Sequence, residues 1–520
     1  PIRAYVEHAS AERLAAEMGP SAADISEIIP EVRAKLPDLG TPPALEPGPA
    51  RFRLFDSITT FLKNAAQSQP LMLVLDDLHW ADRSSLLLLE FMGQEIGNSP
   101  LLLVGAHRAV KVSRGHPLSH TLGALVREQL FHRVQLDGLT QQEVWELVER
   151  NAGITLTPEA AEVVHSRTDG NPFFVGEVTR QVTLENITQD DEWAIIPEGV
   201  RDAIGRRLNR LSDQCNHMLT TASIIGREFD FRLLIILSGG VSEDQLLQAV
   251  DEALSVHLIE DVRGQMDRYQ FSHALIQETL SEELSTSRRV RLRARIAEAL
   301  EALYGDDGEA HAAELAHHFA EAQTSTGITK LVRYSLLAGE QALAAYAWDE
   351  ALAHFERGLV ARDITLSGTE APTDDEAAAL LFGLARARVA TVEEYQLGEA
   401  FATLSRAFEY YAEAGNVAQA VAAAEFPIAT PGYLIPGLAE LMARALTLVP
   451  ADSHEAGRLL SRYGGILGAA ESDYEGAQQA LGRAISIARR EGDVVLEVKT
   501  LTYAAIVSGR HLHWQESIDH

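Results

Sequence analysis

The sequence predicts a multidomain protein that begins with an α/β domain and ends in an all-α array of helices. Two short apolar runs, 71–76 (LMLVLD) and 101–105 (LLLVG), are typical of buried parallel strands. From about residue 290 onward, alanine and leucine recur at helical spacing between short turns. A chain of 520 residues also exceeds what one hydrophobic core supports, so we expect several domains.

The composition excludes several classes of protein. With 46% hydrophobic and 23% charged residues the chain is ordinary for a globular protein, and no apolar run approaches the roughly 20 residues of a membrane span. The single cysteine, Cys215, excludes an intramolecular disulfide. Because no secretion leader opens the chain either, we expect a cytoplasmic protein without a membrane segment.

The net charge of −31 would repel nucleic acid unless a local basic surface overcame it. Basic residues gather at 288–295 (RRVRLRAR), where they alternate with apolar residues. We interpret this run as an amphipathic connecting helix, with a nucleic-acid contact as the less favoured alternative.

The two apolar runs enclose an amphipathic segment, 84–97, which predicts a helix and hence a right-handed βαβ unit. A third short strand is expected at 134–136. Two helices follow, the first opened by a capping box of Thr140 and Glu143 and the second by Thr157 before a proline. These helices predict a small lid.

Residues 198–285 predict another kind of domain. Helical stretches lead into 257–273, which indicates two strands around a glycine-containing turn. Helices followed by a β-hairpin are the ingredients of a winged helix. Farther along, weak repeats with tetratricopeptide spacing predict a helical solenoid, carried by Gly339, Trp348, Ala351 and Phe355 and again by Gly465, Tyr474, Ala477 and Ala484.

The strongest chemical signal is the aspartate pair Asp76 and Asp77, which ends the first apolar run. A buried strand delivers such carboxylates to the ligand crevice of an α/β sheet, where one can hold Mg²⁺ and the other can orient or deprotonate an attacking water. On this pattern alone, a strand followed by an aspartate-rich helix cap is an equally good explanation.

Three segments together resemble a known family: 73–82 (LVLDDLHWAD), 101–108 (LLLVGAHR) and 167–178 (RTDGNPFFVGEV). They are similar to the ATPase module of STAND-type regulators, in the AAA+/P-loop class. Such modules accompany LuxR-type transcription factors of the maltose-regulator kind, some class III adenylate/guanylate cyclases and some serine/threonine kinases. The resemblance covers roughly residues 40–290 closely and the repeats more loosely.

The resemblance assigns roles to residues of this chain. Asp76 and Asp77 match the Walker B pair, and Arg108 matches the sensor arginine that reads the γ-phosphate. The family usually has Thr or Ser two positions before that arginine, where this chain has Ala106, so slow hydrolysis is implied. Asn171 and Pro172 match the lid element whose proline packs on adenine; a simple loop before a helix is the alternative.

His273 matches, in the resemblance, a winged-helix histidine that reaches the ADP phosphates. The next residue is Ala274, where related proteins carry aspartate. A structural histidine at the end of the hairpin is therefore an alternative at least as good.

The chain contains no GxxxxGK[ST] motif, the loop that cradles phosphates. Because the first residue is Pro1 and the sequence stops within an apparent repeat, we expect a chain cut at both ends, with that loop upstream. The expected domains are the C-terminal part of a P-loop NTPase α/β domain (1–138), a helical lid (139–195), a winged helix (196–290) and repeats similar to tetratricopeptide repeats (291–520).

These features predict a fragment of an ATP-dependent switch that binds ATP or ADP with Mg²⁺. Its repeats would bind an unknown inducer or protein, and DNA would be contacted only through a LuxR-type domain outside this chain. Two alternatives remain: the regulatory region of a class III cyclase, and an interaction scaffold that does not hydrolyse ATP. Hydrolysis is expected of a longer chain and not of this one, which lacks the P-loop.

Overall fold

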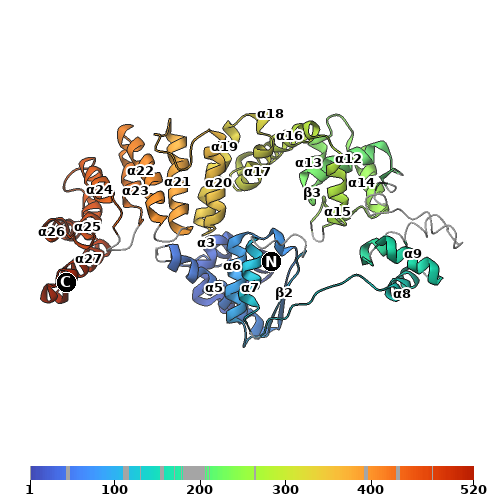
Figure 1. The fold of residues 1–520 in the computed structure, drawn as a ribbon, viewed down its shortest axis with the longest axis horizontal. Coiled ribbons are helices and arrows are strands. Elements are labelled where there is room, and N and C mark those ends of the chain that lie inside the picture. The colour runs from blue at the N-terminus through green and yellow to red at the C-terminus, as the bar shows by residue number, and fades with distance from the viewer. Residues whose placement is uncertain are drawn as a thin grey trace. The chain divides into compact units, whose positions relative to one another are not determined.

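A computed structural model gives the fold of most of the chain. The chain divides into two compact units, one of residues 1–132 with 328–520 and the other of residues 133–327 (Figure 1). The structure describes residues 2–42, 47–108, 116–128, 130–152, 157–168, 170–176, 179, 205, 208–209, 211–262, 265–391, 396–428, 434–470 and 472–519.

The first unit opens with helices that share one core. They are α1 (Ile2–His8), α2 (Ala11–Met18), η1 (Gly19–Ser21), α3 (Ala22–Ile28), α4 (Pro30–Lys35) and α5 (Pro47–Ser68). Phe61 of α5 is fully buried among apolar residues of the short helices. Glu17 is buried too, and its carboxylate accepts hydrogen bonds from the Tyr5 hydroxyl (2.7 Å) and the Arg13 guanidinium (2.8 Å). These partners offset the cost of burying its charge.

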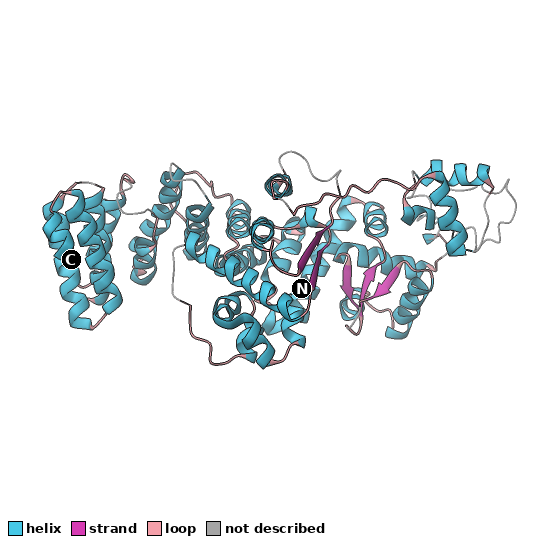
Figure 2. Ribbon diagram, turned by 90° about the horizontal axis from the view of Figure 1, so that it is seen from below, coloured by secondary structure: helices cyan, strands magenta, loops and turns pink. Residues whose placement is uncertain are grey.

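A two-stranded parallel sheet follows, made of β1 (Leu71–Leu75) and β2 (Leu101–Gly105) (Figure 2). Leu71 pairs with Leu101 and Leu75 with Gly105. Between the strands lie η2 (Leu78–Trp80) and α6 (Arg83–Glu95), and α7 (Pro117–Leu125) comes after β2. The predicted adjacent parallel strands are confirmed.

The expectation that both faces of these strands are buried is wrong for the described part of the chain. Side chains alternate along a strand, and only one set packs against the helical core. On the other face Met72 is 63% exposed and Leu102 is 57% exposed. Continuous hydrophobicity thus predicted the strands correctly, while the described helices cover one face of them.

The rest of the first unit is helical, as the repeats predicted (Figure 1). Gly339 and Gly383 permit the close packing, since a Cβ on either would lie within 2.6 Å of the Phe355 ring. The helices are α19 (Thr329–Ala344), α20 (Trp348–Ala361), α21 (Asp375–Thr391), α22 (Leu397–Glu413), α23 (Val417–Glu425), α24 (Leu438–Thr447), α25 (His454–Ala469), α26 (Tyr474–Glu491), α27 (Val494–Arg510) and α28 (Trp514–Asp519).

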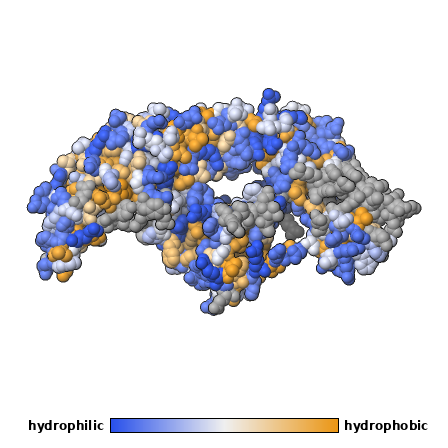
Figure 3. Space-filling model, viewed as in Figure 1, coloured by the Kyte–Doolittle hydropathy of each residue, from blue (hydrophilic) through white to orange (hydrophobic). Residues whose placement is uncertain are grey.

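Figure 3 shows hydrophilic residues over much of the visible surface of these helices, with hydrophobic ones scattered among them. The interior of α19 to α25 instead holds a continuous apolar core that includes Phe355, Leu381 and Phe408, all fully buried. The repeats are therefore stabilised by contacts between successive helices, as expected of a solenoid.

The second unit begins with α8 (Gln141–Ala152) and α9 (Pro158–Thr168). The predicted capping box is present, since the Glu143 carboxylate accepts from the Thr140 amide at 2.8 Å. The strand expected at 134–136 is wrong: these residues form an extended segment without strand pairing, and Leu136 is 89% exposed. An apolar alternation alone cannot make a strand when no partner strand or core receives it.

A compact domain of helices and a small antiparallel sheet follows, with strand order β3-β5-β4 (Figure 2). Leu234, Leu258 and Phe271 are fully buried in its core. The elements are α12 (Asp213–Ile225), β3 (Glu228–Asp230), α13 (Phe231–Leu237), α14 (Glu243–Ser255), β4 (Ile259–Asp261), β5 (Arg268–Phe271) and α15 (Ala274–Glu282). The two expected strands are present as β4 and β5, and Gly264 of the expected turn lies outside the described residues.

Three more helices complete this unit: α16 (Thr286–Tyr304), α17 (Ala312–Glu321) and α18 (Gln323–Thr326), with η5 (Gly305–Asp307) between the first two. The basic run 288–295 lies in α16. There Arg293 pairs with Glu321, and Arg295 donates to the carbonyl of Leu237. These internal contacts agree with the interpretation of the run as a connecting helix.

Candidate functional site

Asp76 and Asp77 follow directly after β1, at the carboxyl edge of the parallel sheet. Asp76 is exposed, and one of its carboxylate oxygens, Oδ1, accepts from the Asp77 amide at 2.9 Å. Asp77 is half-buried and has a left-handed backbone (φ 53°), which aspartate tolerates better than most residues. The turn thereby presents two neighbouring carboxylates at the edge where α/β sheets bind ligands.

Backbone hydrogen bonds continue past the strands and bring Arg108 to the same edge. The amide of Ala106 donates to the Leu75 carbonyl, and the amide of Leu78 donates to the Ala106 carbonyl, both at 2.9 Å. Arg108 comes two residues later and is half-buried. The segments carrying Asp76 and Arg108 are therefore neighbours, as the motif spacing implied.

A histidine that the sequence did not single out joins these two segments. His79 is only 5% exposed, and its Nδ1 accepts from the Arg108 amide at 3.5 Å. The same Nδ1 lies 3.9 Å from Asp77 Oδ1. A nitrogen that accepts a hydrogen bond carries no proton, so this geometry requires the tautomer protonated on Nε2. The only hint in the sequence is its position two residues after the aspartate pair.

The carboxylates at this sheet edge fit a Mg²⁺ ion that takes its remaining ligands from water and phosphate oxygens. Mg²⁺ typically takes one or two carboxylates together with water and substrate phosphates. Asp76 offers an exposed carboxylate whose second oxygen, Oδ2, is not engaged by the Asp77 amide. Within the described ranges no group of three or more His, Cys, Asp or Glu side chains could hold a metal by itself. A magnesium ion here would therefore depend on phosphate oxygens and water as well as on Asp76.

Asn171 and Pro172 belong to the second unit, in a tight turn beside Leu139. Gly170 has φ +65°, and a Cβ there would lie 2.1 Å from the Leu139 carbonyl oxygen, so glycine is required. The Asn171 side chain accepts from the Phe173 amide at 3.0 Å, and both Asn171 and Pro172 are exposed. The loop-before-helix alternative describes this local structure correctly, and the turn still leaves both side chains accessible.

His273 lies in the same unit, at the N-cap of α15. Its Nδ1 accepts from the Leu275 amide at 3.2 Å, which satisfies one of the unpaired amides at the start of the helix. Its ring stacks on Phe173, with ring centroids 3.9 Å apart and an angle of 20° between the planes. The geometry thus gives His273 the structural role that the alternative foresaw, and places it against the segment of Asn171 and Pro172.

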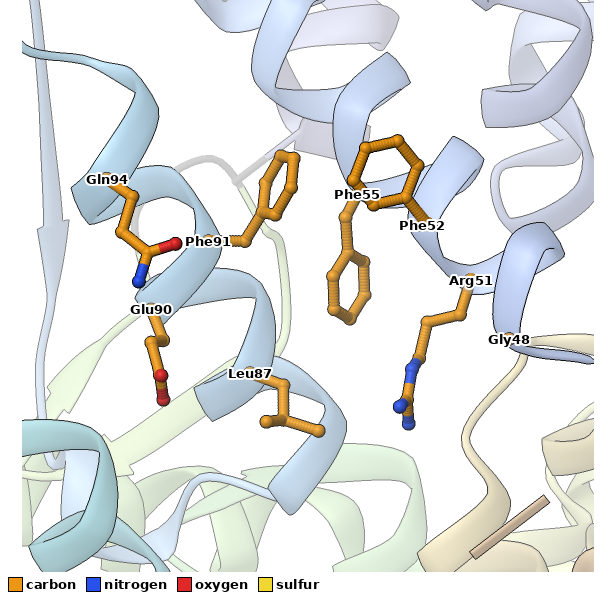
Figure 4. Close-up of a pocket in the computed structure, with 8 residues that line it drawn as sticks. All are labelled: Gly48, Arg51, Phe52, Phe55, Leu87, Glu90, Phe91 and Gln94. Atoms are coloured by element: carbon orange, nitrogen blue, oxygen red, sulfur yellow. The ribbon is translucent and has the colours of Figure 1, made fainter. Parts of the chain in front are cut away.

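The pocket between α5 and α6 is a different feature. Figure 4 shows Phe52 and Phe55 facing Phe91 across the gap between the helices, with Arg51 beside them. The volume is about 270 Å³, and neither Asp76 nor Arg108 lines it. Burial lowers the pKa of the Arg51 guanidinium, which lies 4.6 Å from the centre of the Trp348 ring. This pocket, with three phenylalanines among its eight lining residues, does not belong to the candidate nucleotide site.

Comparisons with known proteins show what this chain is similar to. Residues 1–104 match the AAA ATPase domain family. A solved Signal Transduction ATPase with Numerous Domains (STAND) protein with a tetratricopeptide repeat sensor, from Pyrococcus horikoshii, is 15% identical with a TM-score of 0.33, over 90% of this chain and 69% of that chain. No curated protein matches the chain significantly.

In the described parts of the chain, no helix combines the length and the apolar character that crossing a membrane requires. The family match instead covers β1, β2 as far as Val104, and the two aspartates between them. Over residues 1–104, this chain is similar to the AAA ATPase domain family.

Proposed function

We propose that this chain is the interior part of a nucleotide-dependent signalling switch of the STAND class. The observation that carries the proposal is the position of Asp76 and Asp77 at the carboxyl edge of β1, inside the segment similar to AAA ATPase domains. The helical repeats supply the surface for an inducer or protein partner. A LuxR-type DNA-binding domain outside this chain is our preferred output.

In this proposal the residues of the first unit bind and read the phosphates. Asp76 would hold Mg²⁺ through its carboxylate, and Asp77 would orient the attacking water. Arg108 contacts the γ-phosphate. His79 accepts from the Arg108 amide, which ties the turn after β1 to the segment of Arg108. The magnesium ion would supply charge neutralisation between the phosphate oxygens.

The residues of the second unit take the base and the diphosphate. Pro172 packs on adenine, Asn171 lines the same turn, and His273 donates from Nε2 to a phosphate oxygen while its Nδ1 caps α15. The switch would follow from differential binding of the nucleotide to two conformations of the chain.

The test uses a chain extended upstream to include a P-loop. Asp76→Ala should abolish Mg²⁺-dependent ATP hydrolysis, because the carboxylate ligand is lost. Asp56→Ala is the matched control, since Asp56 is an exposed aspartate on α5 away from the sheet edge. Unchanged turnover in Asp76→Ala would refute the Walker B role. The 520-residue chain itself should show no hydrolysis above background.

A further inference from the structure

A second pocket of about 320 Å³ lies in the first helical repeats, near the turn between α19 and α20. Its walls combine apolar and aromatic side chains with one opposite-charge pair. The residues that matter are Leu343, Tyr346, Trp348, Phe426, Glu340 and Arg386. A mostly apolar wall with a few convergent polar groups, in a volume of roughly 300 Å³ or more, is the usual make-up of a small-molecule site.

Arg386 is the positively charged group in the wall of this pocket. It forms an ion pair with Glu340, and its guanidinium lies 4.7 Å from the centre of the Phe382 ring. Its buried Nε has no hydrogen-bond partner within the described structure. A guanidinium carries five N–H donors in a planar fork and binds carboxylates in a bidentate manner. An incoming carboxylate could therefore occupy donors that Glu340 leaves unused.

We propose that this pocket binds a small molecule that carries an apolar ring and a carboxylate. The ring packs between the aromatic walls, Tyr346, Trp348 and Phe426, and the carboxylate pairs with Arg386. The inference deepens the proposed function and rests on it, because it gives the repeats' inducer a site and a chemical class.

Two of the three aromatic side chains, Tyr346 and Trp348, also contact residues 1–104, the AAA-like segment. The Tyr346 hydroxyl donates to Glu27 of α3 at 2.9 Å, and burial with this partner raises the pKa of Tyr346 to about 12. Tyr346 has a left-handed backbone (φ 58°), which is uncommon for an aromatic residue. The face of Trp348 receives the Arg51 guanidinium of α5.

Further contacts join α20 to the start of α6, which follows the aspartate pair in the sequence. Asp349 pairs with Arg83 at 3.4 Å, and Glu350 accepts from the Ser84 hydroxyl at 3.3 Å. Arg83 and Ser84 open α6, six residues after Asp77. Because Tyr346 and Trp348 belong both to the pocket wall and to these contacts, we infer that ligand binding and the contacts strengthen one another.

Binding is tested with the 520-residue chain and indole-3-acetate, using indole-3-acetamide as the uncharged match and isothermal titration as the measurement. The acid should bind at least about tenfold more tightly than the amide, because a charge-assisted pair with Arg386 is absent from the amide. Arg386→Gln should remove this preference.

Arg388→Gln is the matched control, because Arg388 lies on the same helix, bonds Thr403 at 3.0 Å and does not line the pocket. Thermal unfolding of both variants shows whether they fold. Absence of binding by indole-3-acetate, hydrocinnamate and benzoate at millimolar concentration would overturn the proposal, as would an unchanged preference in a folded Arg386→Gln.

A separate variant tests the contact between Tyr346 and the AAA-like segment. Glu27→Ala removes the acceptor of Tyr346 without touching the pocket wall, so indole-3-acetate should bind about threefold or more weakly. Glu12→Ala, an exposed glutamate on α2, should leave binding unchanged. Equal affinity in Glu27→Ala and the parent chain would overturn the link. These titrations need no nucleotide, so their failure is distinguishable from failure of the Asp76 test.

Discussion

His273 holds the start of α15 and the ring of Phe173 together, so different substitutions separate its structural and nucleotide-binding roles. His273→Ala loses both the cap, worth about 1 kcal/mol, and the ring stack, worth about 0.5–1.5 kcal/mol. His273→Asn restores a good N-cap and loses only the stack. The free energy of unfolding should therefore fall by about 2 kcal/mol in the first variant and by about half of that in the second.

Nucleotide binding is then measured in the chain extended to include a P-loop. If the imidazole touches the ADP phosphates, both variants lose a hydrogen bond to a charged group, worth about 1.5–3 kcal/mol, and ADP affinity falls roughly tenfold or more. Phe173→Leu is the control that removes the stack and leaves the imidazole. Unchanged ADP affinity in both His273 variants, with the expected losses of stability, would refute the switch role and leave a purely structural histidine.

Three further outcomes follow from burial. Burial lowers the folded-state pKa of His318 to about 4, below the ordinary value near 6.5. Between about pH 6.5 and pH 4, therefore, only the unfolded chain takes up the proton. The free energy of unfolding should drop as pH falls over that range, and it should drop by less in His318→Gln. Burial raises the pKa of the Cys215 thiol to about 12. A thiol reagent at pH 8 should therefore label Cys215 only after the protein is unfolded in urea. Fast labelling of the folded protein would contradict the buried position. Gly383→Ala should lower the melting temperature, because its Cβ would lie 2.3 Å from the Phe355 ring. Gly398→Ala on α22 should leave the melting temperature unchanged, because a Cβ there would meet no atom within 4 Å.

The parallel strands and the aspartate pair were predictable from the sequence because each depends on local pattern. A continuous apolar run that ends in two carboxylates indicates both a strand and its exposed end, and β1 with Asp76 confirms this placement. The capping box of Thr140 and Glu143 was predictable for the same reason, since its partners are three residues apart. The role of Asp76 in catalysis stays a prediction, because position alone does not test it.

Other features depend on contacts between distant residues. The stack of Phe173 on His273 joins positions one hundred residues apart, and no periodicity indicates it. The strand expected at 134–136 failed for the converse reason, since its apolar residues find no partner strand. Residue pattern therefore predicts which segments can pair, and the tertiary fold decides whether they do.

His79 and His273 are both held by a main-chain amide at Nδ1, and this bears on the proposed switch. Nδ1 of His79 accepts from the amide of Arg108, and Nδ1 of His273 accepts from the amide of Leu275. Each bond exists only while Nδ1 is unprotonated, so in the neutral ring the proton lies on Nε2. Each imidazole is thus oriented by the main chain and can act only as a donor at its other nitrogen. For His273 that is the hydrogen-bonding character that an ADP phosphate oxygen requires, so the structural cap and the proposed phosphate contact are compatible in one residue.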